Sequence, residues 1–105
     1  MTDRPLGFDT LAIHAGTAPD PATGARQVPI YQTTAYVFRD ADHAAKLFNL
    51  QEVGYIYSRL TNPTVSALAN RVVALEGGAG GIACSSGHAA QIMALFPLMA
   101  PGRNV

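Results

Sequence analysis

The sequence predicts an α/β fold, in which an irregular N-terminal half precedes the first unit of a parallel sheet. The second half carries, in order, an apolar strand candidate, a glycine-containing turn, a helix, a turn and a second strand candidate. Its 105 residues are 49% hydrophobic and only 13% charged, whereas about 25% charged is typical. Small domains have much surface relative to their volume. We therefore expect this apolar chain to bury surface against other protein.

The composition also excludes several classes of protein. Seven acidic residues balance seven basic ones, which argues against a charged disordered tail and against a nucleic-acid binder driven by phosphate neutralisation. The single cysteine allows no internal disulfide. The N-terminus lacks an apolar signal segment, and the longest apolar stretch, residues 92–100, is too short to cross a bilayer. We expect a cytoplasmic chain without membrane or nucleic-acid partners.

Residues 1–39 are predicted to be largely irregular, because prolines and glycines interrupt them repeatedly. Residues 10–14 could form one helical turn. Residues 27–38 are extended in character, and such a segment orders only by lying on its own chain or on a neighbour. A floppy tail is the alternative, but the many aromatic and β-branched side chains of this segment argue against it.

Two helices follow, each with a capping residue at its start. Asp40 is predicted to cap a short helix that reaches Phe48 and carries Lys46, the only lysine, on its solvated face. Residues 55–62 are predicted to form a loop rich in hydrogen-bonding groups. Asn62 and Pro63 then begin the clearest helix. Its apolar stripe comprises Val65, Leu68, Ala69, Val72 and Leu75, and Gly77 and Gly78 end it.

The last third contains the strand candidates. Residues 81–84 are predicted to form a short strand that buries Cys84 as a small hydrophobe rather than a nucleophile. Residues 85–87 form a turn, and residues 88–95 form a helix that Pro97 disturbs. A turn at residues 101–102 leads to a second strand, expected to begin at residues 104–105.

Ser86, Gly87 and His88 are the first candidate site. A helix N-terminus presents free N–H groups and a partial positive charge, which suit a phosphate, and a glycine lets an anion approach the backbone. Serine is also an ordinary helix cap, so the residues alone leave both interpretations open. The pattern is neither a Walker loop nor a dinucleotide fingerprint.

Tyr57 and Arg59 are the second candidate site. In an extended loop, two residues that are two positions apart point the same way, and together they offer a guanidinium fork and a phenol to a phosphate or carboxylate. The alternative is an exposed arginine packed on an aromatic ring. The three histidines lack metal-ligand spacing, so no metal site is expected.

Several motifs together resemble the cysteine/methionine-metabolism family of pyridoxal-phosphate enzymes. They cover nearly the whole chain in the family's order, and residues 19–48 are most similar to its O-acetylhomoserine sulfhydrylase branch. The motifs are residues 11–16, residues 29–34, Tyr57-Ser58-Arg59, Asn62-Pro63-Thr64, and residues 75–78 followed by Ser86-Gly87.

The resemblance implies a fold type I, aspartate-aminotransferase-like enzyme. Residues 1–61 would be an N-terminal arm that contacts a neighbouring subunit, and residues 62–105 the beginning of the large cofactor-binding domain. The implied reaction is a γ-replacement on O-acetylhomoserine with sulfide or methanethiol, giving homocysteine or methionine. Pyridoxal 5'-phosphate would serve as the electron sink.

The same resemblance assigns roles to the two candidate sites. Tyr57 and Arg59 match the pair that reaches the phosphate of a neighbour's cofactor. Gly87 and His88 match the positions whose N–H groups hold the phosphate of the chain's own cofactor, with Ser86 beside them. This implies a homo-oligomer, expected to be a tetramer, with sites shared between subunits. The family's cofactor-bearing lysine is expected beyond Val105, so these 105 residues alone are expected to be inactive.

Two departures and two alternatives accompany the resemblance. The family commonly has Met or Gln at the position of His88, and the sulfhydrylases usually have Asn at the position of Tyr55. Within the family, a methionine γ-lyase or a cystathionine γ-synthase is the alternative. Outside it, the alternative is a non-enzymatic anion-binding or interaction module.

Overall fold

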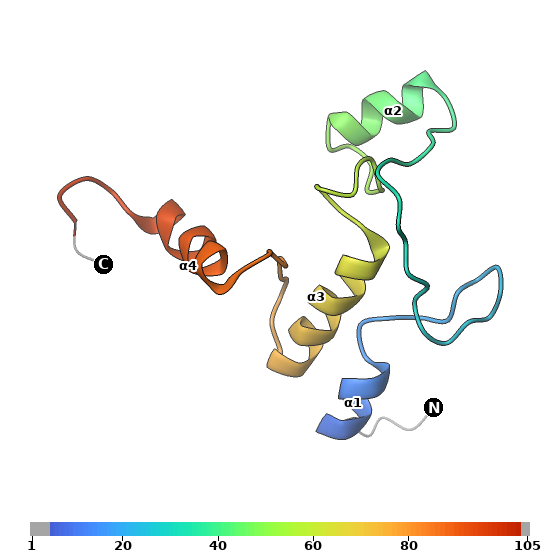
Figure 1. Cartoon of the computed structure of the whole chain (residues 1–105), viewed down its shortest axis with the longest axis horizontal. Coiled ribbons are helices and arrows are strands. Elements are labelled where there is room, and N and C mark those ends of the chain that lie inside the picture. The colour runs from blue at the N-terminus through green and yellow to red at the C-terminus, as the bar shows by residue number, and fades with distance from the viewer. Residues whose placement is uncertain (1–4, 104–105) are drawn as a thin grey trace.

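The computed structural model describes residues 5–103. The long helix α3 occupies the middle of the molecule, with α1 beside its C-terminal part, α2 beyond its N-terminal end and α4 set apart (Figure 1). The elements are α1 (Phe8–His14), α2 (Ala41–Phe48), α3 (Pro63–Glu76), α4 (Gly87–Leu95) and a short 3-10 helix, η1 (Phe96–Leu98).

The predicted caps begin the helices where the sequence places them. The side chain of Asp40 accepts a hydrogen bond from the backbone N–H of His43 at the start of α2. Asn62 and Ser86 cap α3 and α4 in the same way. Gly77 ends α3 in the left-handed conformation, with φ of 65°. After α4 the chain tightens into η1, which contains the predicted disturbance at Pro97.

The strand predicted for residues 81–84 is not formed, and that prediction is wrong for this chain. A strand requires a neighbour to pair its N–H and C=O groups, and the described residues place none beside this segment. Cys84 is consequently exposed rather than buried. The second strand, expected at residues 104–105, lies outside the described residues.

The extended segment before α2 orders by pairing with the loop before α3. Ala35 and Tyr57 form an antiparallel bridge. The N–H of Tyr36 donates to the carbonyl of Ile56 at 3.2 Å, and the N–H of Ser58 donates to the carbonyl of Thr34 at 2.8 Å. The extended segment therefore orders by lying on its own chain, which was one of the two possibilities expected from the sequence. It is not a floppy tail.

A close backbone contact fixes the turn after α1 against α3. Gly16 has φ of +75°, and a Cβ atom there would lie 2.6 Å from the backbone nitrogen of Arg71. Arg71 donates from Nε to the carbonyl of Ala15 at 3.1 Å and from Nη2 to Oγ1 of Thr17 at 3.3 Å. Only glycine combines this conformation with this approach, so the α1–α3 contact depends on it.

The chain leaves most of its apolar surface uncovered. Leu47, at 3% exposure, is the one buried apolar side chain of the described residues. The accessible surface is 8821 Å², against about 5,600 Å² for a compact monomer of this mass. The radius of gyration is 17.3 Å, against about 13 Å for a compact domain. The structure thus supports the expectation that other protein covers this surface.

The predicted apolar stripe of α3 is part of this uncovered surface. Val65, Leu68 and Val72 are exposed to 46%, 61% and 49%, although their spacing places them on one side of the helix. Within residues 5–103, we find no helix that is both long and apolar enough to cross a membrane.

Candidate functional site

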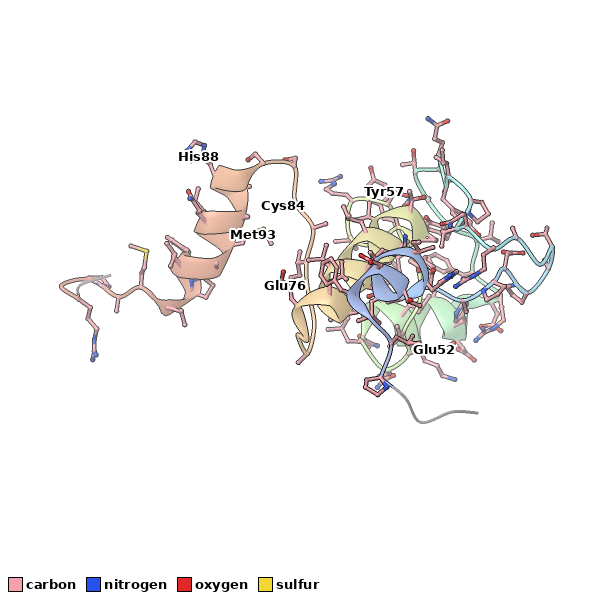
Figure 2. The ribbon with its side chains drawn as sticks, turned by 90° about the horizontal axis from the view of Figure 1, so that it is seen from below. Glu52, Tyr57, Glu76, Cys84, His88 and Met93 are labelled. Atoms are coloured by element: carbon pink, nitrogen blue, oxygen red, sulfur yellow. The ribbon has the colours of Figure 1, made fainter. Side chains whose placement is uncertain are left out.

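The five predicted site residues lie in two separate places. Tyr57 and Arg59 lie on the loop between α2 and α3, whereas Ser86, Gly87 and His88 form the N-terminus of α4. Figure 2 shows Tyr57 and His88 in different parts of the molecule. No hydrogen bond between the described residues joins the two groups. The chain therefore presents two candidate half-sites that do not converge.

The N-terminus of α4 has two free backbone donors. Oγ of Ser86 accepts from the N–H of Ala89 at 3.1 Å, and the carbonyl of Ser86 accepts from the N–H of Ala90 at 3.0 Å. The N–H groups of Gly87 and His88 have no acceptor among the described residues. These unpaired groups carry the positive end of the helix dipole, which favours an anion.

The space at Gly87 fits the same interpretation. A Cβ atom built there would meet no other atom within 4 Å, and the backbone is not in the left-handed region. Neither the packing of this chain nor its backbone geometry requires a glycine at this position. The missing side chain leaves room for a ligand beside the two N–H groups. These residues fit a phosphate group.

Tyr57 and Arg59 contact each other, although the loop turns after Tyr57 and is not extended as the sequence interpretation assumed. Nη2 of Arg59 lies 3.5 Å from the hydroxyl of Tyr57, and its Cζ lies 5.1 Å from the ring centroid. This is the arginine-on-aromatic packing of the sequence alternative. Arg59 is nevertheless exposed, and it carries more donors than this contact uses. The pair therefore fits an anion that approaches from outside the chain.

A pocket of about 490 Å³ adjoins this pair. Its other lining residues are mostly apolar and come from the extended segment, the end of α2 and the loop before α3. They are Ala35, Tyr36, Phe38, Phe48, Ile56 and Leu60. The two donors thus lie at the edge of an open, largely apolar surface.

Sequence reasoning assigned Asn62 only the role of a helix cap. Asn62 is 6% exposed and is the buried polar residue of the described chain. Its Nδ2 lies within hydrogen-bond distance of the carbonyl of Tyr31 (3.0 Å), the hydroxyl of Tyr36 (3.2 Å) and Oγ of Ser58 (3.0 Å). These partners are 4 to 31 residues away in sequence, so local pattern gave no signal for them.

A polar cluster that the sequence did not indicate joins the two ends of α2. Nη2 of Arg39 lies 3.0 Å from Oε1 of Glu52, and Nε2 of His43 lies 3.5 Å from the same oxygen. The hydrogen bond from Arg39 holds the pKa of the Glu52 carboxyl below its usual value.

Lys46 is exposed on α2, as predicted. Among residues 5–103, no three His, Cys, Asp or Glu side chains are grouped to bind a metal.

Solved structures with this fold define the class of protein. A structure from Campylobacter jejuni, described as an O-acetylhomoserine (thiol)-lyase holding a pyridoxyl-lysine monophosphate, superposes with a TM-score of 0.86 at 48% identity. A cystathionine gamma synthase from Xanthomonas oryzae superposes with a TM-score of 0.78 at 32% identity. The matches cover 93% and 94% of this chain, and 24% of each of those chains. The chain has the fold of the matching part of fold type I pyridoxal-phosphate enzymes.

The family follows from the sequence comparisons. The family model for Cys/Met metabolism PLP-dependent enzymes matches residues 9–105, and the chain belongs to this family. It is 56% identical over 100 residues to "O-acetyl-L-homoserine sulfhydrylase 1" of Thermus thermophilus. It is 57% identical over 98 residues to "Homocysteine synthase" of Schizosaccharomyces pombe. These alignments cover 95% and 93% of this chain, which spans about a quarter of the length of those relatives (24% and 23%).

Proposed function

We propose that the protein carrying this sequence is a pyridoxal-phosphate enzyme that replaces the γ-substituent of O-acetylhomoserine. Sulfide or methanethiol would displace acetate and give homocysteine or methionine. The relatives named as O-acetyl-L-homoserine sulfhydrylases are 52% to 56% identical to this chain. The cystathionine gamma synthase structure is 32% identical, so the sulfhydrylase reaction is favoured over cystathionine synthesis.

The observation that carries this proposal is the free N-terminus of α4. Ser86 caps the third N–H of the helix and leaves those of Gly87 and His88 open beside an unfilled space. Two backbone donors at a helix start are the features that a phosphate needs. We propose that they hold the phosphate of this chain's cofactor and that Tyr57 and Arg59 bind the phosphate of a neighbour's cofactor.

The division of the chain follows the same proposal. We propose that residues 1–61 form an arm on a neighbouring subunit and that residues 62–105 belong to the cofactor-binding domain. The separation of the two half-sites and the uncovered apolar surface support a site built from two chains. The tetrameric state and cytoplasmic localisation stay predictions from the sequence.

The residues of this chain would bind and orient rather than transfer protons. Bound pyridoxal phosphate supplies an electron sink for carbanions at the substrate. Gly87 and His88 would fix its phosphate through their N–H groups, and the guanidinium of Arg59 would neutralise part of its charge. Lys46, the only lysine, is exposed on α2. We therefore expect the cofactor-bearing lysine outside these 105 residues.

The test is a substrate comparison on the whole purified protein, loaded with pyridoxal phosphate. We expect homocysteine to form from O-acetylhomoserine and sulfide faster than cystathionine forms from cysteine, and faster than methionine is cleaved. Preferred cleavage of methionine or synthesis of cystathionine would replace the sulfhydrylase assignment by one of those two. A protein that binds no pyridoxal phosphate would revive the non-enzymatic module, which the family match disfavours.

A further inference from the structure

We propose that Ser58 and Asn62 are positioning residues that hold Tyr57 and Arg59 in the direction needed to bind a neighbour's cofactor phosphate. The inference rests on the proposed function, because it gives that pair a phosphate to bind. It goes further by assigning a role to two side chains that touch neither cofactor nor substrate. It rests on the position of Ser58, a hydrogen-bonded serine that lies between the two donors Tyr57 and Arg59.

The anchor and the donors line different pockets. Tyr57 and Arg59 line the pocket of about 490 Å³. Ser58 and Asn62 line another pocket, of about 470 Å³. The loop turns tightly at this point, because the carbonyl of Tyr57 accepts from the N–H of Leu60 at 2.9 Å and from the N–H of Thr61 at 3.1 Å. A displacement of Ser58 within this turn would therefore move both flanking donors.

Ser58 is held by hydrogen bonds from the extended segment and from Asn62. Its N–H donates to the carbonyl of Thr34 at 2.8 Å, and its Oγ donates to the carbonyl of Thr33. Nδ2 of Asn62 donates to the same Oγ at 3.0 Å. The hydroxyl of Tyr36 lies 3.4 Å from that Oγ. This small side chain thus has its donor and its acceptor capacity satisfied at once.

Asn62 connects this anchor to the rigid part of the fold. Its Oδ1 accepts from the N–H of Thr64 at 2.9 Å in the first turn of α3, while its Nδ2 reaches Ser58 and the carbonyl of Tyr31. One buried side chain therefore joins the donor loop, the extended segment and α3. Holding the donors in place before binding reduces the entropic cost of ordering them when the phosphate binds.

The experiment measures pyridoxal-phosphate affinity on the whole apoenzyme by fluorescence titration, with Tm measured in parallel. Ser58→Ala removes the anchor hydroxyl. Asn62→Asp removes the amide donor but keeps the helix cap, since aspartate caps as well as asparagine. We expect Ser58→Ala to raise the cofactor Kd about fivefold, the effect of one neutral hydrogen bond. Asn62→Asp should raise the Kd further and also lower Tm, because the amide donor loses three partners and a buried carboxylate oxygen then faces the carbonyl of Tyr31. We expect Ser58→Thr, which keeps the hydroxyl, to restore the original affinity.

Thr61→Ala is the matched control, because Thr61 lies on the same loop and its side chain makes no hydrogen bond among the described residues. It should leave the Kd unchanged. The decisive comparison repeats Ser58→Ala in an Arg59→Ala background. If Ser58 acts through Arg59, its effect on the Kd should largely disappear there, while its effect on Tm persists.

The outcomes separate this inference from the proposed function. If Arg59→Ala itself leaves the Kd unchanged, the proposed phosphate role of the pair fails. If Arg59→Ala raises the Kd but Ser58→Ala and Asn62→Asp do not, the positioning role is wrong and the proposed function stands. An equal Ser58→Ala effect on the Kd in both backgrounds would show a general structural role and would also overturn the inference.

Discussion

The Tyr57–Arg59 loop and the N-terminus of α4 both present donors that suit a phosphate, but their own chain supports them very differently. The loop is bridged to residues 34–36, anchored through Ser58 and joined to α3 through Asn62. The start of α4 has little beyond its Ser86 cap, and α4 packs on none of α1, α2 and α3.

This difference teaches where each half-site obtains its rigidity. If the pair binds a neighbour's cofactor as proposed, its own chain must hold it in place, because the proposed arm would have no surrounding domain. Backbone donors at a helix start are already aligned by the helix, and a surrounding domain can fix the helix itself. The apolar groups near residues 68–90 are open for such covering, around a pocket of about 540 Å³.

The largest expected effect comes from disrupting the contact between α3 and the turn at Gly16. Gly16→Ala forces a left-handed alanine and places its Cβ 2.6 Å from the backbone of α3, which should lower the free energy of unfolding by about 3 kcal/mol. Denaturant unfolding of the whole protein measures this. Gly24→Ala is the control, because φ there is +73° but the space is open, and it should cost only about 1 kcal/mol. Equal costs would contradict the close α1–α3 contact.

The next largest effect is expected from removing the guanidinium of Arg59. Arg59→Ala loses a charge-assisted hydrogen bond of about 2 kcal/mol, which corresponds to a roughly thirtyfold rise in the cofactor Kd. Titration of the apoenzyme with pyridoxal phosphate measures this change. Arg59→Lys should keep part of the affinity, because lysine retains the charge without the planar fork. An unchanged Kd in Arg59→Ala would remove Arg59 from the phosphate site.

A smaller effect is expected at the N-terminus of α4, the half-site with little support from its own chain. Ser86→Ala should cost about 1 kcal/mol of stability through loss of the α4 cap. It should also raise the cofactor Kd several-fold, because the first turn of α4 would fray and the N–H groups of Gly87 and His88 would lose their alignment. Ser86→Asn, which keeps a capping oxygen, should behave nearly as the original protein in both thermal unfolding and titration. If Ser86→Ala binds the cofactor normally, the cap is not needed to hold the donors.

The smallest effect concerns the polar cluster on α2, outside both half-sites. The folded-state pKa of Glu52 is lowered by Arg39, so its stabilisation is present above the unfolded-state pKa and is lost as the pH falls through the folded-state pKa. Because Glu52 is partly exposed, the effect is small and screened by salt. Glu52→Gln should lower Tm slightly at neutral pH and low salt. A difference that persists in strong acid would contradict this origin.

Local features of the fold could be predicted from the sequence, and non-local ones could not. The caps at Asp40 and Asn62 were predicted, and Ser86 was one of two open interpretations, because each cap uses an N–H two or three residues away. The strand at residues 81–84 was wrongly expected, because strand formation depends on partners that the described chain does not supply. The exposure of Cys84 follows from the same cause.

The same distinction applies to the candidate site. The contact between Tyr57 and Arg59 is local, because it spans two residues, but it forms in a turn and not in the extended loop on which the sequence interpretation depended. Ser58 and Asn62 escaped notice because the partners that define their role lie up to 31 residues away in sequence. The sequence therefore indicated the two candidate donors but not the groups that we propose to orient them.

The central claim is that one cofactor site takes its phosphate donors from two chains, and subunit mixing tests it most directly. Arg59→Ala lacks the outward donor, while Gly87→Glu places a carboxylate where the phosphate would lie. Each variant alone should bind pyridoxal phosphate poorly. Co-expressed in equal amounts, they should recover about a quarter of the original tight sites, because half of randomly formed pairs are mixed and each mixed pair has one intact site. Binding no better than that of the two parents would contradict a shared site.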